Sequence, residues 1–126
     1  MKILVIEDNP ANMKLASSLL RTKGYQVLEA SNASSGIMLA EQQLPDLILM
    51  DIQLPGMDGL AATGLLKSKP ETKCIPIIAL TAFAMQGDEK KMLAAGCDGY
   101  ISKPIRYKEF LAMIETFLGK GGKQNE

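Results

Sequence analysis

Short apolar runs alternate along the chain with longer segments in which apolar residues recur every three or four positions. Runs of strand length lie at residues 2–6, 25–30, 47–50, 76–80 and 99–102. The run from Leu47 to Met50 is apolar at every position, which is typical of a parallel strand buried on both faces. The run at 25–30 is more polar and fits a strand at or near a sheet edge.

Five further segments have the spacing of amphipathic helices. Asn9 can cap the first, which has a proline in its first turn and ends at Gly24. We expect the second to begin at Ser31, to keep Leu44 on its apolar face and to be ended by Pro45. The remaining helices are predicted at residues 58–69, 85–95 and 107–118.

The alternation of five strands with five helices predicts an α/β domain with a parallel sheet covered on both faces. In such a doubly wound, flavodoxin-like (βα)5 sandwich the strand order is 2-1-3-4-5. Ligands bind outside the carboxyl ends of the first and third strands, where the order reverses. We expect residues 1–118 to form this domain and residues 119–126 to form a flexible tail.

Composition restricts the classes of function. Apolar residues make up 47% of the chain and charged residues 22%, and no apolar run approaches the roughly 18 residues of a membrane span. Because the amino terminus has no signal-peptide pattern, we expect a cytoplasmic protein without membrane contact. Fourteen basic and fourteen acidic residues give zero net charge, which argues against direct nucleic-acid binding. Cys74 and Cys97 are interpreted as small buried thiols.

Acidic residues follow the two strands that meet at the expected ligand site. Glu7 and Asp8 come after the first strand, and Asp51 closes the third. An acid in such a place can simply cap the next helix. The position at the switch point nevertheless favours a functional role for Asp51.

The chain has no histidine, so Ser-His-Asp, Cys-His and zinc-histidine chemistry is excluded. Three neighbouring carboxylates repel one another and require positive charge, of which Lys103 supplies one unit. An all-oxygen cluster of this kind suits Mg²⁺. With a metal ion in place, Asp51 can attack phosphorus and become an acyl phosphate, while Thr81 and Lys103 hold the phosphoryl oxygens.

The motifs around these residues resemble the receiver domains of response regulators, from Lys2 to about Leu118. Within that family the sequence is most similar to single-domain regulators of the DivK type. The resemblance rests on Glu7-Asp8-Asn9, Asn12-Met13-Lys14, residues 45–55, Thr81-Ala-Phe-Ala-Met85, Gly87-Asp88 and Tyr100-Ile-Ser-Lys-Pro104.

The resemblance implies a metal site and a phosphoacceptor. Asp51 would accept the phosphoryl group, and Asp8 and Asp51 would bind Mg²⁺ directly. Glu7 would act on the metal through water, and Gln53 would contribute its backbone carbonyl.

The resemblance also implies a switch. Thr81 and Tyr100 would be the switch residues, Lys103 the ion-pair partner of the phosphoryl group, and the Lys103–Pro104 peptide bond cis. The signal would leave through the face formed by the fourth helix, the fifth strand and the fifth helix.

The expected function is therefore that of a phosphorylation-activated switch in two-component signalling, which catalyses its own phosphorylation and dephosphorylation but is no conventional enzyme. Its partners would be a sensor histidine kinase or a histidine phosphotransfer protein, together with an unknown downstream protein. Two alternatives stay open at this point: a receiver-like module that binds partners without phosphorylation, and a flavodoxin-like cofactor-binding domain.

Overall fold

Five parallel strands form one sheet in the order β2-β1-β3-β4-β5, as the sequence predicts. The computed structural model describes residues 1–54, 56–82 and 86–124. Pro55 and residues 83–85 of the sequence motifs lie outside the described residues. The strands are β1 (Lys2–Ile6), β2 (Gln26–Ala30), β3 (Leu47–Asp51), β4 (Ile77–Thr81) and β5 (Gly99–Ser102). The helices are α1 (Pro10–Thr22), α2 (Ala33–Gln43), α3 (Gly59–Ser68), α4 (Gln86–Ala95) and α5 (Tyr107–Gln124).

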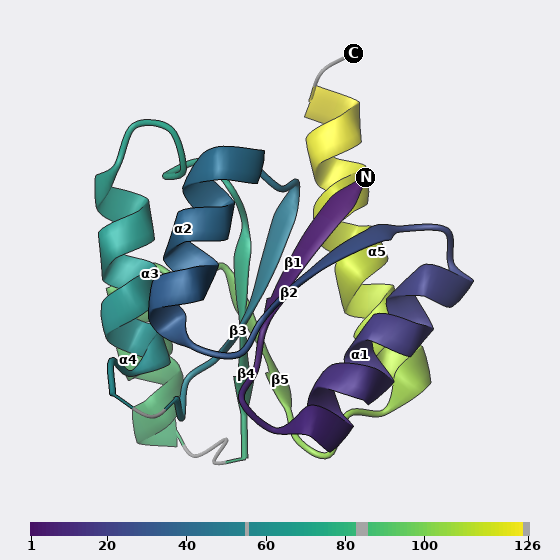
Figure 1. Ribbon diagram of the computed structural model, residues 1–126, viewed down its shortest axis with the longest axis horizontal. Coiled ribbons are helices and arrows are strands. Elements are labelled where there is room, and N and C mark those ends of the chain that lie inside the picture. The colour runs from purple at the N-terminus through teal and green to yellow at the C-terminus, as the bar shows by residue number, and fades with distance from the viewer. Residues whose placement is uncertain (55, 83–85, 125–126) are drawn as a thin grey trace.

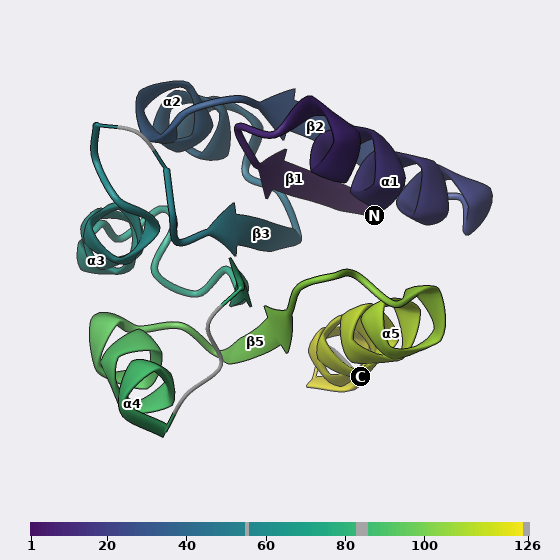
Figure 2. The same cartoon turned by 90° about the horizontal axis from the view of Figure 1, so that it is seen from below.

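The helices cover both faces of the sheet. Helices α1 and α5 lie on one face, and α2, α3 and α4 lie on the other (Figures 1 and 2). This arrangement confirms the predicted doubly wound α/β fold.

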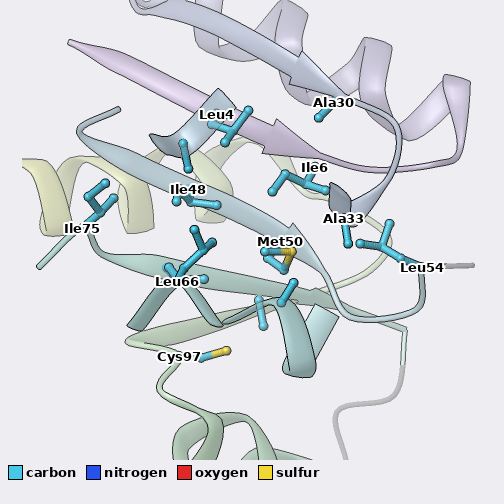
Figure 3. Packing of buried hydrophobic residues seen from close by; sticks show 14 of the residues in the cluster. Leu4, Ile6, Ala30, Ala33, Ile48, Met50, Leu54, Leu66, Ile75 and Cys97 are labelled. Atoms are coloured by element: carbon cyan, nitrogen blue, oxygen red, sulfur yellow. The ribbon is translucent and has the colours of Figure 1, made fainter. Parts of the chain in front are cut away.

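The continuous apolar runs supply two separate cores because successive side chains of a strand point to opposite faces. In β1, Ile3 and Val5 pack under α1 and α5, whereas Leu4 and Ile6 pack under the other helices. Figure 3 shows residues of this second core, among them Leu4 of β1, Ile48 of β3 and Leu66 of α3. Strands β1, β3 and β4 are almost fully buried, whereas β2 is partly exposed, as predicted for an edge strand.

Among the described residues, polar side chains cap the helices α1, α2 and α3. The Asn9 side chain accepts from the N–H groups of Ala11 and Asn12, which confirms the predicted start of α1. Asp58 caps α3 through a 2.8 Å bond from the Ala61 N–H. After α1 the chain turns at Gly24, whose φ of 86° favours glycine.

Helix α2 differs from the prediction at both ends. Asn32, and not Ser31, is its cap, and it accepts from the Ser35 N–H at 2.8 Å. Leu44 has left the helix, has a φ of 46° and is 53% exposed. The cause is Pro45, because a residue before proline avoids the helical conformation.

Two further expectations need correction. Helix α5 continues to Gln124, beyond the expected end at Leu118, because helical hydrogen bonds can propagate past the last buried apolar residue. The flexibility of residues 119–126 stays a prediction. Cys97 is buried as expected, but Cys74 is exposed because it lies in the turn between α3 and β4. Within the described parts of the chain, no helix combines the length and apolar character needed to cross a membrane.

Candidate functional site

Three carboxylates meet where β1 and β3 end side by side. One carboxylate oxygen from each of Glu7, Asp8 and Asp51 lies within 4.8 Å of the others. Asp51 is the last residue of β3, and Glu7 and Asp8 directly follow β1. The parallel register of the two strands therefore brings together acids that are more than forty residues apart in sequence.

The Asp51 carboxylate is held on both of its oxygens. Its Oδ1 accepts a 2.9 Å hydrogen bond from the Gln53 N–H, and its Oδ2 accepts a 3.2 Å bond from the Lys103 ammonium. The residue is only 2% exposed. These contacts fix the orientation of the carboxylate.

Glu7 is as deeply buried as Asp51. It is 1% exposed, and its Oε2 accepts a 3.2 Å bond from the Asn9 N–H. Its Oε1 lies 2.9 Å from the Lys103 nitrogen as an ion pair, although the angle is not that of a hydrogen bond. Glu7 therefore shares the Lys103 ammonium with Asp51.

Lys103 reaches the acids from the end of β5. The backbone N–H of Lys103 donates to the Thr81 carbonyl at 2.7 Å. The peptide bond between Lys103 and Pro104 is cis. Thr81 is fully buried at the end of β4. The ends of four strands thus contribute to one site.

The surroundings of the two buried carboxyl groups shift their pKa values in opposite directions. Burial, assisted by the hydrogen bond with Asp51, raises the pKa of Glu7 to about 7, against the opposing effect of Lys103. Burial also acts to raise the pKa of Asp51, but the hydrogen bonds with Glu7 and the Gln53 N–H, together with Lys103, lower it below its usual value. Burial acts to lower the pKa of Lys103, but its contacts with Glu7 and Asp51 raise it. Asp51 thus remains an anion when Glu7 carries a proton.

The donor set suits a hard divalent cation. All three side chains offer oxygen, and Asp8 is exposed to solvent, as is required of a ligand to an ion that keeps several waters. Lys103 balances only part of the charge of three carboxylates. A cation with two positive charges would offset the rest.

Comparisons with known proteins agree with this geometry. Residues 3–115 match the family of the response regulator receiver domain. The chain belongs to the response regulator receiver family. It is therefore a receiver domain of two-component signal transduction. Membership of this family argues against the alternative of a flavodoxin-like cofactor-binding domain.

The receiver domain is similar to the polar-differentiation response regulators DivK of two Brucella species. It is 46% identical to DivK of Brucella anthropi and 45% identical to DivK of Brucella abortus, in both cases over 93% of this chain and 95% of the relative.

Solved receivers have the same fold. A receiver domain protein of Methanospirillum hungatei superposes with a TM-score of 0.90 at 28% identity, and the alignment covers 98% of this chain and 97% of that one. The receiver domain of a sensor histidine kinase of Pseudomonas aeruginosa superposes with a TM-score of 0.87 at 38% identity. That alignment covers 94% of this chain and 97% of the Pseudomonas chain. The latter structure has a magnesium ion coordinated in its active site cleft.

Two predicted residues remain: Gln53, two positions after Asp51, and Tyr100 on β5. Gln53 is exposed beyond Asp51, so its N–H and not its side chain contacts the carboxylate. Tyr100 of β5 is half-buried against the core under α4, on the side of β5 away from α5.

Two features of the site were not predicted. The sequence indicated an acidic pair but not that Glu7 is buried while Asp8 is exposed. The only available signal was the alternation of successive residues between faces. The backbone N–H groups of Asn9 and Gln53 also had no sequence signal, because any residue type offers that donor.

Proposed function

We propose that Asp51 accepts a phosphoryl group from a phosphohistidine of a sensor histidine kinase or a histidine phosphotransfer protein. An oxygen of the Asp51 carboxylate attacks phosphorus, the bond to the imidazole nitrogen breaks, and an acyl phosphate results. The observation that carries this proposal is the buried, ionised and oriented Asp51 carboxylate. A carboxylate that is ionised and held in one orientation can act as the nucleophile toward phosphorus.

Asp8, Asp51 and the backbone carbonyl of Gln53 would hold Mg²⁺, with Glu7 acting through a water molecule. When bound, Mg²⁺ neutralises the charge that accumulates on the phosphoryl oxygens. The support for this assignment is the carboxylate cluster and the exposure of Asp8.

Lys103 and Thr81 would hold the new phosphoryl oxygens. Lys103 already contacts Asp51, and its raised pKa keeps it charged at neutral pH. Thr81 is buried at the neighbouring strand end and brings a hydroxyl to the same region. Phosphorylation would draw both toward the phosphoryl group.

The signal would leave through a protein partner that docks on the face formed by α4, β5 and α5. A groove of about 540 Å³ lies on this face, lined by β5 and by Leu93, Glu109, Met113 and Phe117. Tyr100 of β5 lines the same groove. Strand β5 pairs with β4, so Tyr100 lies on the strand next to the one that ends in Thr81. The switch is an equilibrium between two forms, which the phosphoryl group shifts only by its differential contacts with them.

The test is phosphorylation by a small phosphodonor, followed by intact-mass analysis. We expect one added phosphoryl group with Mg²⁺, and none with a chelator or in Asp51→Asn. Asp58→Asn is the matched control, because it removes a nearby acid and keeps a side chain that caps α3 equally well. Full labelling of Asp51→Asn would refute the assignment. A wild-type protein that takes no label would point to a phosphorylation-independent binding module.

A further inference from the structure

Gly59, the first residue of α3, lies directly against the backbone of the strand that ends in Asp51. Its N–H donates to the Ile52 carbonyl at 3.2 Å. A Cβ at this position would lie 2.3 Å from the Asp51 carbonyl oxygen and 2.5 Å from the Ile52 Cα. These distances are far below the roughly 3.5 to 4 Å of ordinary carbon contacts. The opposing atoms are backbone, so no side-chain rotation can relieve the overlap.

The restriction is one of space and not of backbone conformation. The φ of Gly59 is outside the left-handed region, unlike those of Gly24, Gly56 and Gly96. An alanine could therefore adopt the same backbone angles but not the same distance from β3. Gly64, in the same helix, provides the contrast because a Cβ added there would meet no atom within 4 Å.

The backbone that Gly59 touches carries the Asp51 site. The next residue along from Ile52 is Gln53, whose N–H holds Asp51 Oδ1 at 2.9 Å. The Ile52 N–H donates to Leu80 of β4 at 3.2 Å. A shift of the Asp51 and Ile52 peptides therefore moves the donor that orients the carboxylate.

We propose that Gly59 is a positioning residue for the phosphoacceptor site: its missing side chain lets α3 hold the peptides of Asp51 and Ile52, and so the Gln53 backbone, in place. The metal-related part of this proposal rests on the proposed function, because it takes the Gln53 carbonyl as a Mg²⁺ ligand. The part that concerns the Gln53 N–H does not.

The experiment compares three single variants of α3. Gly59→Ala introduces the overlap. Gly64→Ala adds the same methyl group in open space, and Ala61→Gly weakens the helix at an exposed position without touching β3. Each variant is assayed without metal by the amide exchange rate of Gln53, and with Mg²⁺ by titration of amide chemical shifts.

We expect Gly59→Ala to accelerate Gln53 exchange by about tenfold or more, because hydrogen bonds to charged groups are strong. We also expect Mg²⁺ affinity to fall by about 10- to 100-fold, the usual effect of disturbing groups that orient metal ligands. Ala61→Gly and Gly64→Ala should leave both quantities at the wild-type value. A Gly59→Ala protein with wild-type Gln53 exchange and Mg²⁺ affinity would overturn the proposal.

Two further outcomes are decisive. If Gly59→Ala folds poorly, the experiment is repeated with the double variant Gly59→Ala/Gly64→Ala, in which the second substitution strengthens the helix. If the double variant also fails to fold, Gly59 is required for folding, and its positioning role is overturned. If wild-type protein binds Mg²⁺ but takes no label at Asp51, the proposed function fails. In that case faster Gln53 exchange in Gly59→Ala would still support the positioning role.

Discussion

Glu7 is a buried acid whose ionisation opposes folding, so removing its charge should stabilise the metal-free protein. Glu7→Gln keeps the shape of the side chain. Its amide oxygen can still accept from the Asn9 N–H, and its amide nitrogen can donate to Asp51. The variant therefore keeps the length of the side chain but removes its charge and, with it, the ion pair between Glu7 Oε1 and Lys103.

The magnitude follows from the shift in pKa. The Glu7 pKa rises from an ordinary 4.5 to about 7 in the folded protein. Because one pKa unit corresponds to about 1.4 kcal/mol, ionised Glu7 lowers the free energy of unfolding by roughly 3 kcal/mol. Between the two pKa values the folded state binds more protons than the unfolded chain. Stability is therefore lost as pH rises through this window, and the loss is complete above it.

The assay is urea unfolding of wild type and Glu7→Gln with a chelator, at intervals from pH 4 to pH 8.5. We expect the two proteins to have similar stability at the acidic end. At pH 8 the variant should be more stable by up to about 3 kcal/mol. Glu71→Gln, at an exposed position, is the control and should show no such pH-dependent gain.

The opposite sign of the stability difference at pH 8 would contradict this prediction. If Glu7→Gln is less stable than wild type at pH 8, the ion pair with Lys103 outweighs the cost of burying the charge.

Two other predictions concern the metal site and α2. Mg²⁺ at 100 times its dissociation constant should stabilise the wild type by about 2.7 kcal/mol, and Asp8→Asn should lose most of this gain. Since Asp8 is exposed, its substitution should change metal-free stability by less than about 1 kcal/mol. Urea unfolding with and without Mg²⁺ measures both effects, and an unchanged Mg²⁺ response of Asp8→Asn would contradict the ligand assignment. Leu44→Gly should raise stability by up to about 1 kcal/mol, because leucine is strained at a φ of 46° and half of its side chain is already in solvent. A lower denaturation midpoint for Leu44→Gly would show that its remaining contacts matter more than the strain.

The segments that form strands and helices could be predicted from the sequence, because both depend on local periodicity. The unbroken apolar run from Leu47 to Met50 indicated a strand buried on both faces, and β3 has that environment. The alternation of elements then implied the parallel sheet and its strand order. From that order, the meeting of Asp51 with Glu7 and Asp8 was also predictable.

The sharing of charge among Glu7, Asp51 and Lys103 could not be predicted from local patterns and becomes visible in the folded protein. Which acid of the pair is buried, and that Lys103 contacts both Glu7 and Asp51, depend on packing between strand ends far apart in sequence. The need for a glycine at position 59 could not be predicted from the sequence either, because it arises from the distance between α3 and β3. Local patterns specify which face of an element is apolar. The distances between side chains from different elements are fixed only when the two cores pack.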